Sequence, residues 1–339
     1  MLASAMPKRN TSDRIHGELA LIEAIRSRAA RTRTSGVRMG IGDDCAVLRP
    51  RTGYEICVTT DFSLEGRHFQ REWHPPQSVG HRCLARGLSD LAAMGAEPLA
   101  VFLSLAVPAR TPASWVDGFL EGLLALARRH HVPLAGGDTA ESPDRIAADI
   151  VAVGQLPKDA ARLRSGARPG DALYVTGALG GAAAELRALS AKPAKFRKLT
   201  RAATGEAHPH LYPQPRLEAG RRLRGIATAM IDISDGLSTD LTHLCRASSV
   251  AADIDEQSLP IHPLALSNQD AIQLALHGGE DYELLFTAAP ATRVPRRIGA
   301  VPVTRIGTVR RTRRGTPLIT MRTRDGQTSL EAKGWEHFR

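Results

Sequence analysis

Acidic residues recur at the ends of apolar runs in this chain, each time beside a glycine or a small hydroxyl residue. Nine carboxylates occur in six such places, namely Ile41-Gly42-Asp43-Asp44, Thr59-Thr60-Asp61, Ser89-Asp90, Gly136-Gly137-Asp138, Asp232-Ile233-Ser234-Asp235-Gly236 and Gly278-Gly279-Glu280-Asp281. A carboxylate at a strand end or a helix start is well placed to reach a crevice that several segments share. Because so many like charges in one site are unstable without cations, the pattern indicates a metal site.

The residues around these carboxylates supply oxygen rather than sulfur or nitrogen. The four cysteines form no Cys-x-x-Cys pair, and no histidine cluster accompanies them, which argues against zinc. Oxygen ligands suit Mg²⁺ or Mn²⁺, and Mg²⁺ is usually bound together with phosphates. The sequence therefore predicts a metal–nucleotide site. It contains neither a P-loop nor the protein-kinase signature set, so any use of ATP requires another architecture.

Each acidic motif taken alone also has a structural interpretation. Asp43-Asp44 suits a turn, and Asp90 suits a helix N-cap. Asp232 and Asp235 bracket a strand-to-helix turn, where one would cap the helix and the other would bind metal. The repetition in six places favours the metal site.

Three further features leave alternatives open. The glycine-rich turn 176–181 opens a helix whose first N–H groups would hold an anion, although such turns are more often structural. His208-Pro209-His210 falls in a probable loop, and we assign it no functional role. Trp335 either docks on the core or offers a flat ring to an aromatic ligand.

Bulk properties exclude several classes of protein. At 339 residues with 42% hydrophobic composition, the chain is long enough for two globular domains. The net charge of +10 is concentrated at residues 1–40 and 291–339, so the motif-bearing middle is mildly acidic, and we expect no nucleic-acid partner. No apolar run approaches the ~20 residues that span a bilayer, and no secretory signal is evident. We expect a reduced, cytoplasmic setting.

Strands and helices alternate along the chain without a regular βαβ period, which predicts an α+β fold. Strands are expected at 54–60, 99–107, 145–154, 171–176, 228–233, 281–288 and 303–309. Helices are expected after a cap at Asp13 and at 76–93, 112–130, 180–190, 214–224, 237–248 and 264–276. We expect a disordered tail at 1–12, an N-terminal domain at 13–156 and a C-terminal domain at 157–339, with 190–213 as a mobile insertion or loop.

Taken together and in order, the motifs resemble those of the thiamine-monophosphate kinase family. The most specific are Ile41-Gly42-Asp43-Asp44-Cys45-Ala46, Thr60-Asp61 with Glu65-Gly66-Arg67-His68-Phe69, Leu88-Ser89-Asp90-Leu91-Ala92-Ala93-Met94-Gly95-Ala96, Gly136-Gly137-Asp138-Thr139, Arg164-Ser165-Gly166-Ala167, Ile233-Ser234-Asp235-Gly236-Leu237 and Gly278-Gly279-Glu280-Asp281-Tyr282-Glu283-Leu284. The resemblance runs from Gly17 to Phe338. The basic stretches 190–207 and 293–314 are less family-like.

The resemblance implies a fold shared with aminoimidazole ribonucleotide and selenophosphate synthetases, in which N-terminal domains pair into a homodimer. It implies ATP-dependent phosphorylation of thiamine monophosphate with several Mg²⁺ ions. The implied metal ligands are Asp44, Thr59, Thr60, Asp61, Asp90, Asp138, Asp232 and Asp235. The implied nucleotide contacts are Gly137, Asp138, Arg164 and Ser234, and the implied substrate contacts are His68, Glu280 and Trp335.

Two rival interpretations remain. A sister synthetase would share the fold, but selenophosphate synthetases tend to carry a reactive cysteine in a glycine-rich segment near the N-terminus, whereas the first cysteine here is Cys45. A nucleic-acid-binding protein would need aromatic residues interleaved with basic ones, and aromatics are only 4% of the chain.

Overall fold

The computed structural model describes residues 17–32, 34–197, 199 and 207–335. The N-terminal half holds a four-stranded sheet in the order β3-β6-β4-β5, with only β4 and β5 parallel, and a small β1-β2 pair. Its elements are α1 (Glu18–Ala29), β1 (Val37–Met39), β2 (Val47–Leu48), β3 (Tyr54–Leu64), α2 (Pro76–Ala93), β4 (Glu97–Val107), α3 (Ala113–Arg129), β5 (Leu134–Glu141) and β6 (Ala147–Pro157).

The C-terminal half holds an eight-stranded sheet in the order β14-β13-β9-β12-β7-β10-β8, with β11 paired to β12. Its strands are β7 (Ala172–Thr176), β8 (Ala229–Ile233), β9 (Val250–Asp255), β10 (Glu283–Ala288), β11 (Arg297–Ile298), β12 (Val301–Arg311), β13 (Ile319–Thr323) and β14 (Gly326–Ser329). Its helices are α4 (Gly181–Ala191), α5 (Leu217–Leu223), α6 (Leu237–Ala247), α7 (Pro263–Leu266) and α8 (Ala271–His277), with short 3₁₀ turns η1 (Pro193–Lys195) and η2 (Glu256–Ser258).

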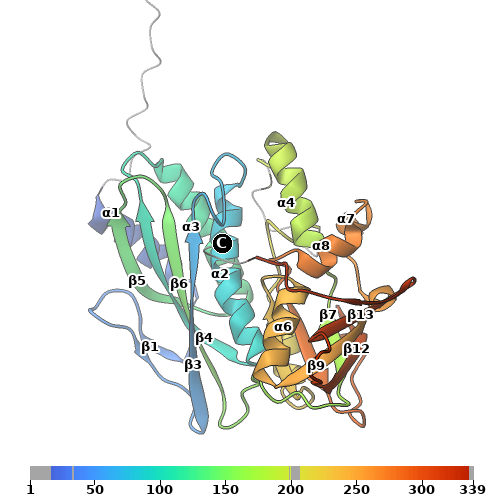
Figure 1. The fold of residues 1–339 in the computed structure, drawn as a ribbon. Helices are drawn as coiled ribbons and strands as arrows, with labels where there is room; N and C mark the ends of the chain where they lie inside the picture. The colour runs from blue at the N-terminus through green and yellow to red at the C-terminus, as the bar shows by residue number, and fades with distance from the viewer. Residues whose placement is uncertain (1–16, 33, 198, 200–206, 336–339) are drawn as a thin grey trace, which may run out of the picture.

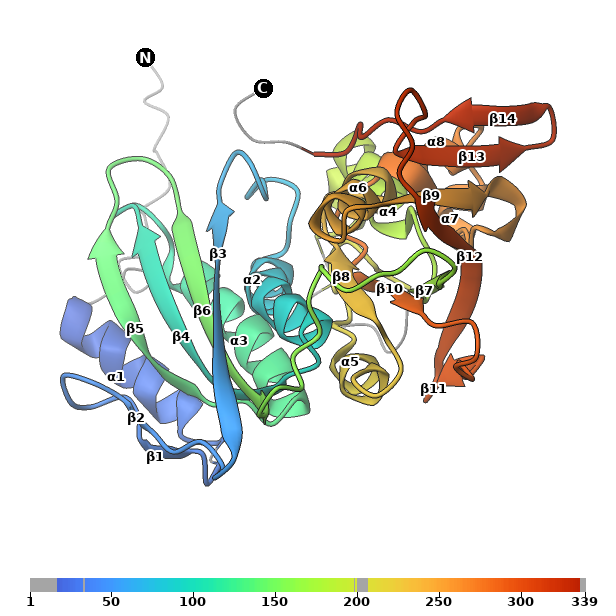
Figure 2. The ribbon, with the colours of Figure 1, turned by 60° about the horizontal axis from the view of Figure 1, so that its bottom comes forward.

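Helix α2 lies between the two halves (Figures 1 and 2). It packs on α3 and on the N-terminal sheet, and it also contacts α5, β8 and β10 of the C-terminal half. Pro76 starts the helix, where a missing N–H costs nothing, and Gly95 ends it at φ +70°. A Cβ on Gly80 would lie 1.8 Å from the Phe119 carbonyl oxygen, so glycine allows the close approach of α2 and α3.

The hydrophobic core continues across the junction of the halves. One cluster joins Leu84 and Leu88 of α2 with Phe119 of α3 and Phe286 of β10, and a second lies within the C-terminal half. Since the junction is packed like a core, α2 holds the two halves in a fixed relation. None of the helices within the described ranges is long and apolar enough to cross a bilayer.

The predicted strands and most predicted helices are present, with ends shifted by a few residues. The helix expected at 264–276 is wrong as one element, because α7 and α8 are separate. Seven strands were not predicted, namely β1, β2, β5, β9, β11, β13 and β14. Strand β5 contains Gly136 and Gly137, which weaken a strand signal. The expected tail at 1–12 and the Asp13 cap lie outside the described residues, as does part of the loop expected at 190–213.

Candidate active site

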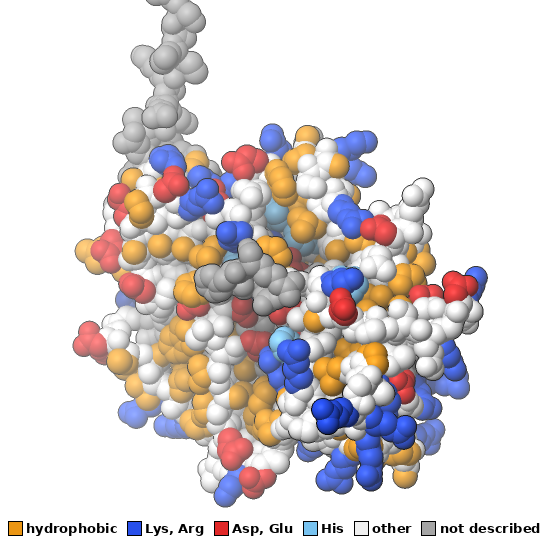
Figure 3. All heavy atoms as spheres, in the orientation of Figure 1, with side chains coloured by type: hydrophobic (Ala, Val, Ile, Leu, Met, Phe, Trp, Pro, Cys, Tyr) orange, Lys and Arg blue, Asp and Glu red, His pale blue; other side chains and the backbone are white. Residues whose placement is uncertain are grey.

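Carboxylates from both halves of the molecule meet beside α2. Asp61 lies on β3, Asp90 on the last turns of α2 and Asp232 on β8. The Thr59 hydroxyl donates a hydrogen bond to the Asp90 carboxylate, and the Ser89 hydroxyl donates one of 2.7 Å to Asp232. Helix α2 therefore links a strand of each half, and acidic side chains are visible between the halves (Figure 3).

Burial and mutual repulsion disfavour ionisation of these carboxyl groups. Burial raises the pKa of Asp61 to about 7. Arg86 lowers this pKa, whereas the neighbouring Asp90, Asp149 and Asp235 raise it further. Burial also raises the pKa of Asp232, with repulsion from Asp90 and Asp61. A cation among these groups would offset their repulsion and favour their ionised form.

The donor chemistry of the group fits Mg²⁺. In the part of the chain that the structure describes, no three His, Cys, Asp or Glu side chains are already arranged to hold a metal ion. Mg²⁺, however, usually takes one or two carboxylates and completes its octahedral shell with water and substrate phosphates. The carboxylates near Asp61 and the Thr59 hydroxyl therefore suit an ion that is shared with a nucleotide.

The predicted metal ligands lie on both faces of the N-terminal sheet. Successive residues of a strand point to opposite faces, so Thr59 and Asp61 face α2, whereas Thr60 is exposed on the outer face. Asp138 of β5 lies on that outer face as well, because it pairs with Ser104, an exposed residue of β4. That the ligands on the two faces of the sheet serve one metal site therefore stays a prediction.

Asp44 lies on the exposed loop between β1 and β2, where its backbone N–H donates to the Asp43 carboxylate at 2.9 Å. Among the described residues, no hydrogen bond or ion pair joins Asp44 to the carboxylates beside α2. Its role as a metal ligand therefore stays a prediction.

Two predicted nucleotide contacts have clear local settings. Arg164 is exposed on the connection between the halves. Burial raises the pKa of Asp90 and of Asp232, and the nearby charge of Arg164 partly opposes this rise. Gly137 has φ +147°, and a Cβ there would lie 1.8 Å from the Leu103 carbonyl oxygen, so only glycine fits.

The turn before α6 carries Ser234 and Asp235. Their backbone N–H groups donate to the Asp240 carboxylate at 3.1 and 3.0 Å. The Asp240 carboxylate thus accepts the backbone N–H groups of this turn. The expectation that Asp232 or Asp235 caps the helix is therefore wrong. The expectation of an N-cap at Asp90 is also wrong, because Asp90 lies inside α2.

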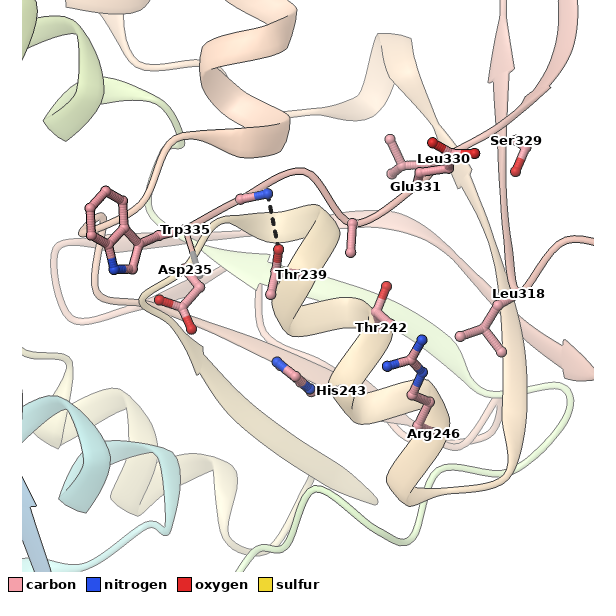
Figure 4. A pocket seen from close by; sticks show the side chains of 12 residues that line it. Asp235, Thr239, Thr242, His243, Arg246, Leu318, Ser329, Leu330, Glu331 and Trp335 are labelled. Carbon is pink, nitrogen blue, oxygen red and sulfur yellow. Dashed lines mark hydrogen bonds between the residues drawn. The ribbon is translucent and has the colours of Figure 1, made fainter. Parts of the chain in front are cut away.

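A cavity of about 630 Å³ opens along α6 (Figure 4). Asp235 and Trp335 lie at one end of it and Arg246 at the other. The Trp335 backbone N–H donates to the Asp235 carbonyl oxygen at 3.1 Å, and Gly334 donates to the Thr239 hydroxyl at 3.1 Å. Trp335 is 48% exposed, which favours a ring platform over docking on the core.

The glycine-rich turn before α4 has a structural occupant. The backbone N–H groups of Gly180 and Ala182 donate to the Asp281 carboxylate at 2.6 and 3.1 Å. Asp281 is buried and therefore occupies the helix start that an external anion would need. The structural interpretation of this turn is confirmed.

Comparison with known proteins assigns the chain to a family. Models for the N-terminal and C-terminal domains of AIR synthase related proteins match residues 42–156 and 168–319. Thiamine-monophosphate kinase of Salmonella typhimurium is 37% identical over 95% of this chain and 98% of its own, and that of Bacillus subtilis is 35% identical over 90% and 95%. This chain belongs to the thiamine-monophosphate kinase family.

Solved structures of the family agree with the fold. Thiamine-monophosphate kinase from Stenotrophomonas maltophilia K279a matches with a TM-score of 0.75 and 36% identity over 90% of this chain and 96% of its own. AaThiL complexed with AMPPCP and TMP matches with a TM-score of 0.74 and 29% identity over 95% and 97%. The predicted two-domain α+β fold of the thiamine-monophosphate kinase family is confirmed.

Two arginines of α2 surround Glu280, a residue for which the kinase family implies a substrate contact. Arg82 donates to both Glu280 carboxylate oxygens at 2.7 and 2.6 Å, and Arg86 forms a second ion pair. Arg82 also donates to the carbonyl oxygen of His68 at 2.8 Å, so one guanidinium holds both implied substrate contacts. Burial alone would raise the pKa of Glu280, but Arg82 and Arg86 hold it well below its usual range.

Sequence reasoning missed Arg82 and Arg86. Both are nearly fully buried, at 3% and 7% exposure. Their spacing of four residues places them on one face of a helix otherwise rich in small and apolar residues. Two arginines on the buried face of a predicted helix are a usable signal for carboxylate partners elsewhere in the chain.

Proposed function

We propose that this protein transfers the γ-phosphate of ATP to thiamine monophosphate, giving ADP and thiamine diphosphate, the last step of thiamine diphosphate biosynthesis. The observation that carries the proposal is the meeting of Asp61, Asp90 and Asp232 beside α2, in a chain whose relatives are thiamine-monophosphate kinases. The AaThiL complex with AMPPCP and TMP supports ATP as the co-substrate.

Several Mg²⁺ ions belong to this proposal. The residues that would hold them are the implied ligands Asp44, Thr59, Thr60, Asp61, Asp90, Asp138, Asp232 and Asp235. When bound, Mg²⁺ would neutralise the phosphate groups of ATP and of the acceptor, which otherwise repel each other. The raised pKa of Asp61, caused by burial and neighbouring carboxylates, supports this assignment.

The remaining residues bind and orient the two substrates. Arg164 would make charge-assisted contacts to the phosphates of ATP, with Gly137, Asp138 and Ser234 as further nucleotide contacts. Trp335 would stack on a ring of thiamine, and His68 and Glu280 would contact polar groups of the same substrate.

We propose direct in-line transfer between the bound substrates. The acceptor is a phosphate oxygen that is already ionised at neutral pH, so a strong general base is not required. Phosphoryl transfer depends mainly on positioning and on neutralisation of charge. Mg²⁺ held by the carboxylates would supply most of this neutralisation, and Arg164 would add to it.

The proposal is tested by incubating the purified protein with Mg-ATP and thiamine monophosphate and separating the products. We expect thiamine diphosphate and ADP in equal amounts. Unphosphorylated thiamine, formylglycinamidine ribonucleotide and selenide serve as alternative acceptors, the last two for the sister enzymes. ATP consumption with either of the last two, and none with thiamine monophosphate, would assign the protein to a sister reaction.

The proposal includes a homodimer formed through the N-terminal halves. Ile56, Val58 and Phe62 alternate along β3 on the face away from α2, and they are 44%, 61% and 60% exposed. Hydrophobic side chains are prominent on this half of the molecule (Figure 3). An exposed apolar sheet face of this kind is typical of a protein–protein interface.

Replacing Val58 with lysine should weaken dimerisation. Each dimer interface would bury two ammonium groups without partners, and we expect the dimer dissociation constant to rise about a hundredfold or more. Leu266→Lys is the matched control, because Leu266 is equally exposed at 61% but lies on α7 of the other half. Light scattering or sedimentation that finds a wild-type monomer, or a Val58→Lys dimer as tight as wild type, would contradict the proposed interface.

A cytoplasmic location completes the proposal. Cys45, Cys57, Cys83 and Cys245 are all unpaired in the structure, which is typical of proteins from reducing compartments.

A further inference from the structure

Two buried histidines lead from the start of α2 to Glu280. His74 and His210 are 3% and 2% exposed, and their Nε2 atoms lie 3.0 Å apart. His210 Nδ1 lies 3.1 Å from a carboxylate oxygen of Glu280. The two histidines are 136 residues apart in sequence, and neither was given a role by the sequence motifs.

We propose that His210, backed by His74, is a positioning residue that orients the Glu280 carboxylate for thiamine monophosphate. The inference rests on the proposed function for the identity of the substrate. The arrangement of protons within the pair rests on geometry alone and can be tested separately.

The charge of Glu280 determines the tautomer of His210. An unprotonated Nδ1 at 3.1 Å from a carboxylate would be repelled by it, so His210 carries its proton on Nδ1. His210 Nε2 is then unprotonated and accepts a hydrogen bond from His74 Nε2.

The tautomer of His74 follows from that of His210. Because His74 Nε2 donates, its Nδ1 is unprotonated and accepts from the Gln70 N–H at 3.2 Å. His74 Nδ1 also lies 3.1 Å from the Gln70 carbonyl oxygen, but that oxygen already accepts the backbone N–H groups of Trp73 and His74 at 3.1 and 2.9 Å. The order that places a proton next to Glu280 therefore runs from the Gln70 N–H to His74 and from His74 to His210.

The surrounding charges keep both rings neutral. Burial and the charge of Arg82 lower the pKa of His210, and the same causes lower that of His74 to about 2. Glu280 already pairs with Arg82 and Arg86, so a third buried cation would leave excess positive charge. Each ring therefore carries one proton.

The segment that carries His210 is fixed to α4. The Glu185 carboxylate accepts the backbone N–H groups of His210 and Leu211 at 2.8 and 3.2 Å, and it contacts the His208 ring at 2.6 Å. Glu185 is itself buried at 3% exposure. His210 is therefore held by its backbone as well as by its ring.

Glu280 needs such support because its backbone is in a sparsely populated conformation. Its φ is +68°, and Tyr282 two residues later has φ +51°. Left-handed conformations at residues other than glycine persist only where surrounding contacts stabilise them. Arg82, Arg86 and His210 approach the carboxylate from α2 and from the 208–211 segment, so they determine where its oxygens point.

The test compares Michaelis constants for the two substrates. His210→Leu removes the donor to Glu280, and we expect the Michaelis constant for thiamine monophosphate to rise about tenfold with that for ATP within about twofold. His210→Asn places an amide N–H near the position of Nδ1 and should recover most of the affinity. His74→Leu should raise the same constant about threefold, since it acts only through His210.

His81→Leu is the matched control. His81 is also buried on α2, and its Nε2 donates to the Pro213 carbonyl oxygen at 2.7 Å, close to the same segment but without a contact to Glu280. A merely structural role predicts that His210→Leu and His81→Leu affect both Michaelis constants alike, and that result would overturn the proposal. Failure of His210→Asn to restore affinity would overturn it too.

Nitrogen NMR of the wild-type protein separates this inference from the proposed function. We expect His210 to be protonated at Nδ1 only and His74 at Nε2 only, whether or not the protein phosphorylates thiamine monophosphate. The opposite tautomers would disprove the relay even in an active enzyme. The expected tautomers in a protein without thiamine-monophosphate kinase activity would disprove only the substrate assignment.

Discussion

Asp61→Asn should lower the turnover number by a factor on the order of 10²–10³, as is typical when one preorganised electrostatic group is lost from an active site. The substitution removes a ligand charge and keeps the size of the side chain. It should at the same time raise the melting temperature of the metal-free protein, because the amide removes a buried carboxylate that its neighbours repel.

The effect of Asp61 on the stability of the metal-free protein should depend on pH. The pKa of Asp61 is raised by burial from 3.8 to about 7, so the folded protein keeps a proton that the unfolded chain loses. Wild-type stability without metal should therefore fall as the pH rises from about 4 to 7, and the Asn variant should lack this part of the loss. Melting temperatures at pH 5 and pH 8 measure the difference.

Asp144→Asn is the control for Asp61→Asn, because Asp144 is an exposed carboxylate paired with Arg110 on the surface of the same half. It should change neither turnover nor melting temperature appreciably. Wild-type turnover of Asp61→Asn at saturating Mg²⁺ would contradict the assignment of Asp61 to the metal site.

Glu280→Ala should destabilise the protein by about 3–5 kcal/mol, the loss typical of breaking a buried ion pair from one side. It leaves Arg82 and Arg86 buried next to each other without an anion. The low pKa of Glu280, caused by these arginines against the effect of burial, adds stability above the unfolded pKa of about 4.5. That stability is lost as the pH falls through the folded pKa of Glu280. The stability of the Glu280→Ala variant should therefore fall less in acid than that of the wild-type protein.

Urea unfolding at neutral pH measures this effect. The control is Glu218→Ala, which breaks the surface pair between Glu218 and Arg222 and should cost about 0.5 kcal/mol or less. Equal losses in the two variants would mean that the ion pairs of Glu280 contribute little to stability.

Local patterns predicted much of this fold. Apolar runs located β3, β4, β6, β7, β8, β10 and β12, and the predicted range 76–93 matches α2. The motif order predicted the family. These features depend on neighbours in sequence, which is why they can be read without a structure.

Contacts between distant residues could not be predicted in the same way. The pairs Arg82–Glu280 and His74–His210 join segments 198 and 136 residues apart. The turn before α4 looked able to bind an anion, but only the structure shows that Asp281 occupies it. Thr59-Thr60-Asp61 appeared as one ligand group, whereas the alternation of a strand divides it between two faces.

The measurement that tests the central claim most directly follows a labelled γ-phosphate from ATP. We predict that the label passes to thiamine diphosphate, that the protein incubated with labelled ATP alone acquires none, and that a chiral γ-phosphate is inverted once. A labelled protein that passes its phosphate to thiamine monophosphate, together with retention at phosphorus and ping-pong kinetics, would contradict direct transfer in a metal–carboxylate site. No label in thiamine diphosphate under any of these conditions would contradict the proposed activity itself.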